Sequence, residues 1–250
     1  MKIKGKNRYK NYFLAAASVM LIAAVVINLS LSYLVSNKQR DNVFSLGNVK
    51  LTLTEEHFPE QEERKIMAPN SIIPKDPRII NSGNSDEYVF LKIVVPLCDV
   101  KMVNDDNKGV SETGYREIFN FGSDAADKQT MGSQGFTIAD TGTFEYAKEW
   151  ILVSSEENLS AHTHSYLFGY SSMLIGDKDQ STTTLFDKIQ MRNILEGELP
   201  IDAAQTIAVY AYGIQSEEIL NQVNINNPSA VTEEELAAIF ALYEKAGGTV

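Results

Sequence analysis

Hydrophobic and polar residues alternate over several short stretches of the chain, which is the pattern of half-buried β-strands. Residues 43–53 alternate from Phe44 or Val49 onward, and we expect one strand there. Residues 88–95 are almost continuously apolar, and Pro96 is expected to end that strand because proline offers no N–H to a sheet. Further strand-forming segments are residues 79–80, 150–153, 165–170 and 206–215, with apolar positions at 185–186 and 189.

The polar stretches between these segments are expected to be loops. The charge run Glu60–Lys65 is typical of a solvated loop. Residues 70–77 contain two prolines and several turn formers, which exclude a central strand there. Residues 104–142 are polar with scattered glycines and apolar positions, and we interpret them as an insertion of loops and short elements. Residues 154–160 are polar and are expected to separate two strands.

The end of the chain follows a helical pattern instead. Residues 232–235 read Thr-Glu-Glu-Glu, the signature of a capping box at a helix N-terminus. Leu236, Ile239, Phe240 and Tyr243 then fall on one face at helical spacing, before glycine stops the helix. We therefore expect a helix over residues 232–246 that follows a β-sandwich or jelly roll with helical additions, in a domain over residues 43–250.

The first residues of the chain have the form of a signal peptide. Five basic residues and no acidic ones fall in the first ten positions, and Phe13–Ile27 is apolar except for one serine. Ser30 and Ser32 supply the small residues that a signal peptidase accepts, so residues 1–32 are expected to be removed and Tyr33 to become the N-terminus. Retention of the segment as a membrane anchor is the alternative.

Composition restricts the function further. Removal of residues 1–32 leaves 17 basic and 33 acidic residues, a formal charge of −16, which argues against nucleic acid as a partner. Cys98 is the single cysteine of the 250-residue chain, so one chain forms no internal disulfide and no cysteine-based metal site. We expect Cys98 to be a small core residue, and an exported chain without disulfides to depend on core packing.

Four stretches of the sequence resemble the exported proteins of Gram-positive bacteria that a dedicated SipW-type signal peptidase processes. This family contains the biofilm-matrix protein TasA, camelysin and the pilin-like protein BsaA, whose branch is the most similar. The matching stretches are Ser30–Tyr33 with Asn42–Val49; Ile73–Pro77 with residues 81–83 and 86–89; residues 174–176 with 183–186; and residues 209–215, in which Gly213 stands where the family has alanine.

The resemblance implies a secreted jelly-roll subunit, without enzymatic activity or cofactor, that forms pilin-like fibres in the biofilm matrix or on the cell surface. Its implied partners are further copies of itself in a head-to-tail polymer, the signal peptidase and an accessory anchor protein. Each subunit would lend a strand to its neighbour by donor-strand complementation, with residues 33–42 as a flexible stem. The expected donor residues are Tyr33, Leu34, Val35, Val43, Phe44, Leu46 and Val49. The alternative is that residues 43–53 form the first strand of the subunit's own sheet.

Other readings remain beside the fibre hypothesis. The family resemblance also allows a camelysin-like cell-surface metallopeptidase, or an accessory protein that anchors or starts fibres. The chain lacks a His-Glu-x-x-His pattern, and we expect His57, His162 and His164 to be surface residues rather than metal ligands. No catalytic Ser-His-Asp order stands out. Lys50 and Lys92, both in apolar strand patterns, are candidates for an internal isopeptide bond, which requires a buried, deprotonated lysine.

Overall fold

The computed structural model of the chain describes residues 44–45, 50–59, 68–103, 109–131, 142–195, 197, 206–220 and 222–246, with the backbone alone at positions 44, 45, 218 and 220. The chain divides into two units, residues 1–40 and 41–250, and the second contains all described residues. The predicted signal peptide and the stem therefore lie outside the described residues. No helix in the described ranges is long and apolar enough to cross a membrane.

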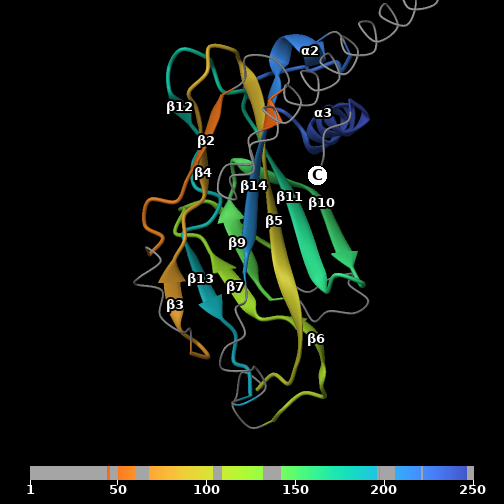
Figure 1. The fold of residues 1–250 in the computed structure, drawn as a ribbon. Coiled ribbons are helices and arrows are strands. Elements are labelled where there is room, and N and C mark those ends of the chain that lie inside the picture. Colours follow the sequence, from red (N-terminus) through yellow and green to blue (C-terminus); the bar gives the residue numbers. More distant parts are fainter. Residues whose placement is uncertain are drawn as a thin grey trace, which may run out of the picture. The chain divides into compact units, whose positions relative to one another are not determined.

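A six-stranded sheet forms one layer of the second unit (Figure 1). Its strand order is β1, β14, β5, β11, β10, and β6 pairs with the far end of β5. All of these pairs are antiparallel except that of β1 with β14, which is parallel. The strands are β1 (Phe44–Ser45), β5 (Glu87–Val100), β6 (Gly114–Glu117), β10 (Trp150–Asn158), β11 (Thr163–Tyr170) and β14 (Ala208–Gln215).

Two smaller sheets form the opposite layer. A three-stranded sheet has the order β12, β4, β2, and a five-stranded sheet has the order β3, β13, β7, β9, β8. The strands are β2 (Leu51–Thr54), β3 (Ile72–Pro74), β4 (Arg78–Asn81), β7 (Phe119–Gly122), β8 (Lys128–Met131), β9 (Phe144–Ala147), β12 (Gln180–Ser181) and β13 (Lys188–Met191). The prediction of a mainly β protein is confirmed.

The central strand β5 contributes side chains to the apolar clusters on both faces of its sheet. Val89, Leu91 and Ile93 point into the main core, which they share with residues of both smaller sheets. Tyr88 and Phe90 point the opposite way, into a second apolar cluster beneath the C-terminal helix. Because both faces of β5 are buried, its sequence is continuously apolar rather than alternating. Each large side chain buried in this way contributes about 1.5–3 kcal/mol to folding.

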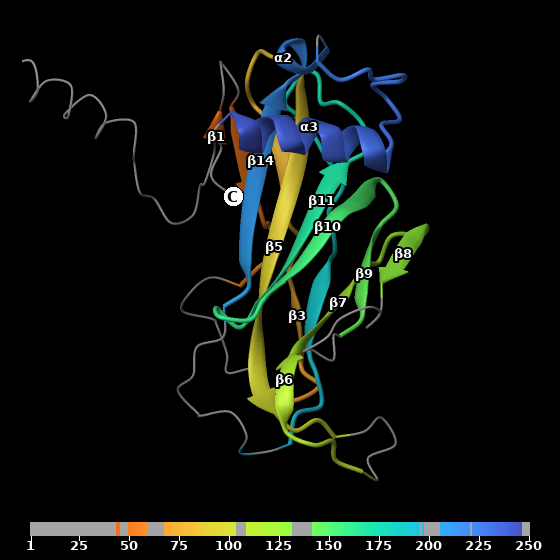
Figure 2. The ribbon, with the colours of Figure 1, turned by 90° about the vertical axis from the view of Figure 1, so that its right-hand side faces the viewer.

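The C-terminal helix α3 (Glu233–Lys245) covers one face of the six-stranded sheet (Figure 2). Its N-cap Thr232 accepts a hydrogen bond from the Glu235 backbone, and the Glu235 side chain accepts one from the backbone of Thr232. Leu236 and Phe240 are buried against the sheet. The predicted capping box and the apolar face are confirmed. A short helix, α2 (Ser216–Leu220), directly follows β14.

Residues 43–53 do not form the single strand that we expected. Phe44 and Ser45 form β1 beside β14, whereas Leu51–Thr54 form β2 beside β4 in a different sheet. Alternation indicates only that one face of a segment is buried and does not specify which sheet a strand joins. The segment therefore passes from one sheet to another.

Strand β5 does not end at Pro96 as predicted but continues to Val100. On one side the pairing with β14 extends only to Val94, which lies opposite Ala208, the first residue of β14. On the other side the Leu97 N–H donates to the His162 carbonyl oxygen. Successive residues of a strand direct their N–H groups to opposite neighbours, so Pro96 faces the side where β14 has ended. The missing N–H of proline therefore leaves no ladder bond unmade.

Two polar stretches contribute more to the sheets than we expected. Residues 104–142, interpreted as an insertion, contain β6, β7 and β8, and β7 lies inside the five-stranded sheet with Phe119 and Phe121 in the core. Residues 154–158 extend β10, whose register shifts between Leu152 and Ser154. The prolines of residues 70–77 fit the prediction, because β3 lies at a sheet edge.

Candidate functional site

The outer edge of β14 is the first candidate site. On one side β14 pairs with β5 over all eight of its residues. On the other side, within the described ranges, it pairs only with Phe44 and Ser45, opposite Tyr212 and Gly213. A strand that is paired along one side presents backbone donors and acceptors that another strand can satisfy.

Gly213 lies where β1 meets β14, and a side chain there would crowd its neighbours. A Cβ atom at this position would lie 2.6 Å from Leu51 Cδ1 and 2.9 Å from Glu87 Oε2. Both distances are shorter than side chains tolerate without movement. The absence of a side chain at Gly213 therefore fits the close approach of β2 and Glu87 to the backbone of β14.

Glu87 is a fully buried carboxyl group at the start of β5. Neither of its carboxylate oxygens has a hydrogen-bond partner of good geometry among the described residues. Burial raises the pKa of Glu87 to about 7, and the backbone of Lys50 partly opposes this shift. Burial of an unpaired carboxylate is costly, so the protonated form is favoured in the folded protein.

The structure places few of the predicted donor residues. Phe44 lies in β1, whereas Tyr33, Leu34, Val35, Val43, Leu46 and Val49 lie outside the described residues.

Neither of the candidate isopeptide lysines is fully buried. Lys50 is exposed just before β2, which does not provide the burial that the reaction requires. Lys92 is half-buried in β5 and lines a shallow hollow together with Glu156 and Glu244 near α3. The isopeptide bond stays a prediction, and intact-mass measurement tests it.

A second candidate site is a buried polar network on the core side of β10, β11 and β6. His164 Nδ1 lies 2.8 Å from Glu117 Oε1, and His164 Nε2 lies 2.8 Å from Ser155 Oγ. The Tyr166 hydroxyl donates to Glu117 Oε1 and lies 3.0 Å from His164 Nδ1. Glu117 Oε2 accepts from the Gly142 N–H at 3.1 Å. His164 and Glu117 are both buried.

These contacts indicate the tautomer of His164. Glu117 is an acceptor when ionised, and it already accepts from Tyr166 and Gly142. Nδ1 then carries the proton and donates to Glu117, which leaves Nε2 as the acceptor of the Ser155 O–H. Burial and the neighbouring Glu117 raise the pKa of Tyr166, so this phenol stays protonated and remains a donor.

The prediction that His164 is a surface residue is wrong. Residues 163–170 form β11, and alternation along this strand directs His164 and Tyr166 to the same side, toward the core. His162 is exposed, as predicted, in the turn before β11, where its ring stacks on Tyr115 at 4.1 Å.

The Ser155 and Glu117 partners were not predicted. The available signal was the Thr-His-Ser-Tyr alternation of residues 163–166, which continues directly into the strand pattern.

His57 is exposed, as predicted. Its Nδ1 lies 2.6 Å from Oδ2 of the buried Asp76, and this hydrogen bond raises the pKa of His57. Cys98 is buried, and burial raises the pKa of its thiol to about 11, which confirms its prediction as a core residue.

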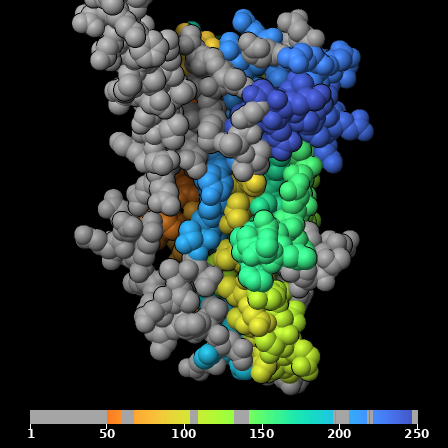
Figure 3. Space-filling model, turned by 45° about the vertical axis from the view of Figure 1, so that its right-hand side comes forward, coloured from red at the N-terminus to blue at the C-terminus, as the bar shows by residue number. Residues whose placement is uncertain are grey.

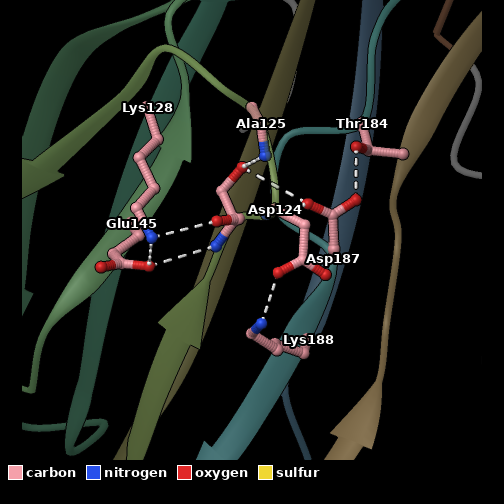
Figure 4. Close-up of polar contacts among 8 residues, drawn as sticks. Asp124, Ala125, Lys128, Glu145, Thr184, Asp187 and Lys188 are labelled. Atoms are coloured by element: carbon pink, nitrogen blue, oxygen red, sulfur yellow. Dashed lines mark hydrogen bonds and ion pairs between the residues drawn. The ribbon is translucent and has the colours of Figure 1, made fainter.

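A third polar cluster connects the turn between β7 and β8 to β13 by hydrogen bonds and ion pairs (Figure 4). The Asp124 N–H donates to Asp187 Oδ2 at 2.6 Å, and Lys188 Nζ lies 2.5 Å from Asp124 Oδ1. Lys128 pairs with Glu145 at 2.7 Å. Because every charged group shown there has a partner within the cluster, we interpret it as structural.

Among the described residues, no group of three or more His, Cys, Asp and Glu side chains is placed to hold a metal ion. Comparison of the chain with protein-family models, with curated proteins and with solved structures finds no match.

Proposed function

We propose that the protein is a secreted structural subunit that polymerises into extracellular fibres by exchange of its N-terminal strand. The observation that carries this proposal is the parallel pairing of the two-residue strand β1 with the edge of β14. In the fibre, the segment that contains Phe44 would leave its own subunit and occupy the β14 edge of the next one. Repetition of this step head to tail produces a filament rather than a closed ring.

The small free energy of the pairing between β1 and β14 favours such an exchange. A backbone hydrogen bond contributes about 0.5–1.5 kcal/mol net, so a two-residue pairing contributes only about 1–3 kcal/mol. By contrast, β2 pairs with β4 over four residues, and Leu51 is buried in the main core. The pairing of β2 with β4 begins at Leu51, so departure of β1 would leave it in place.

The edge that would receive the strand lies beside an exposed part of the sheet. In Figure 3, the dark-blue atoms of α3 lie across the upper part of this face, and atoms of β14 and β5 are visible below them. A jelly-roll connection of the strands, as the family resemblance implies, is part of this proposal.

Electron microscopy of two chains, with and without a synthetic peptide, tests the proposal. We expect filaments from residues 33–250 and none from residues 50–250, which retain the β14 edge but lack the donor segment. A synthetic peptide of residues 33–49 should bind the shortened chain and should cap growing filaments of the longer one. Filaments of equal length and number from residues 50–250 would contradict the proposal. If residues 33–250 only cap filaments formed by another protein, the accessory function replaces the subunit function.

A further inference from the structure

Ser155, His164 and Glu117 lie in the order that activates a nucleophilic serine. The hydroxyl of Ser155 is 2.8 Å from one ring nitrogen of His164, and the other ring nitrogen is 2.8 Å from the Glu117 carboxylate. Nucleophile, base and an orienting acid in hydrogen-bond contact are the arrangement that serine hydrolases reach on unrelated folds, in different chain orders.

The surroundings hold the base in the required form. Glu117 comes from β6, whereas His164 comes from β11, and Tyr166 and Gly142 both donate to the same carboxylate. The ring of His164 also lies 4.2 Å from that of Tyr166, which limits its rotation. Nδ1 therefore faces the Glu117 carboxylate, and Nε2 is the ring nitrogen positioned to take the proton of Ser155.

The serine is the most accessible of the three residues. Ser155 is half-buried on β10, which pairs with β11 on one side and with no other strand within the described ranges. His164 and Glu117 are 0% and 2% exposed in their side chains.

We propose that Ser155 is an acyl-accepting nucleophile, with His164 as its general base and Glu117 as a positioning residue. Ser155 Oγ would attack the carbonyl carbon of a small carboxylic ester while its proton moves to His164 Nε2. The ester C–O bond then breaks, and the proton passes to the leaving alkoxide, which departs as the alcohol. Water, deprotonated by His164, hydrolyses the acyl-serine and releases the carboxylic acid. This activity is independent of fibre formation.

A fluorophosphonate probe tests the proposal without a natural substrate, because it bonds to an activated serine with loss of fluoride. We expect the full mature chain to gain one probe mass, mapped to Ser155 by peptide mass spectrometry. The Ser155→Ala variant should lose this label. Ser154→Ala is the matched control, because Ser154 lines the hollow near α3, and it should label at the wild-type rate.

A further variant separates activation from packing, because it replaces the orienting carboxylate by an amide of nearly the same size. Glu117→Gln should slow labelling of Ser155 at least 10-fold, since general-base assistance contributes about 100- to 10,000-fold. Thermal melting verifies that each variant is folded.

The labelling result decides the proposal in either direction. A wild-type chain that is folded and unlabelled at Ser155, or labelled equally in the folded Glu117→Gln variant, would overturn it. The network would then serve only to join β6, β10 and β11.

Discussion

At the scale of single residues, the contacts of Glu87 and Gly213 connect the buried interior to the edge of β14. Gly213 pairs with Ser45 of β1, and its backbone is approached from the core side by Glu87 and Leu51. Neither role was predictable from the sequence, because Glu87 opens an apolar strand where a carboxylate is usually solvent-exposed. Burial and spacing of this kind depend on the packing of three separate strands.

Replacement of Glu87 by glutamine is expected to change the pH dependence of stability. The pKa of Glu87 rises from 4.5 to about 7 on folding. The stability that the protonated carboxyl group contributes to the fold is therefore fully present below pH 4.5 and is lost as the pH rises to 7. Urea unfolding should show that the unfolding free energy of Glu87→Gln rises relative to that of the wild type between about pH 4.5 and 7.5. The expected relative gain is about 2 kcal/mol, after a reduction for solvent screening. A difference that does not vary with pH would show that Glu87 ionises freely in the folded protein.

The Gly213→Ala substitution should destabilise the domain. The added methyl group would meet Leu51 and Glu87 at less than 3.0 Å, which should cost about 1–3 kcal/mol. Gly114→Ala provides a control in another strand, because the nearest atom to its Cβ would be 3.8 Å away. Equal unfolding free energies for the two variants would mean that β14 and β2 are less closely packed than the structure indicates.

At the scale of elements, the sequence identified those whose signals are local. The capping box and the helical spacing of α3 involve residues within one turn of each other, and the apolar run of β5 is continuous. Strand partners were not predictable, because the pairing of β1 with β14 joins residues far apart in the chain. The continuation of β5 beyond Pro96 also depends on where β14 ends. The network around His164 remained hidden because its members come from three strands.

The cap of α3 should be measurable by itself. Thr232→Ala removes the side-chain acceptor for the Glu235 N–H and should lower the unfolding free energy by about 1 kcal/mol. Thr232→Asn supplies another capping oxygen and should retain most of the wild-type stability. Chemical denaturation of the three proteins under one condition compares these values. Wild-type stability of the alanine variant would contradict this prediction, because it would show that the hydroxyl contributes little.

At the scale of the whole molecule, the protein combines a sandwich that its own core stabilises with an edge strand, β1, that pairs over only two residues. The main core involves all three sheets, so loss of β1 leaves most of it in place. The same arrangement would let one copy receive a segment from another without unfolding. The strongly acidic composition keeps separate copies soluble, so assembly is expected to be favoured by salt, which screens their repulsion.

Photo-crosslinking from position 44 tests the central claim most directly. With p-benzoylphenylalanine in place of Phe44, a conservative aromatic change, irradiated filaments should give a ladder of covalent multimers on a denaturing gel, with crosslinked peptides that join position 44 to residues of β14 around Tyr212. Crosslinks to the same β14 residues that are found only within single chains, in preparations that contain filaments, would contradict strand exchange.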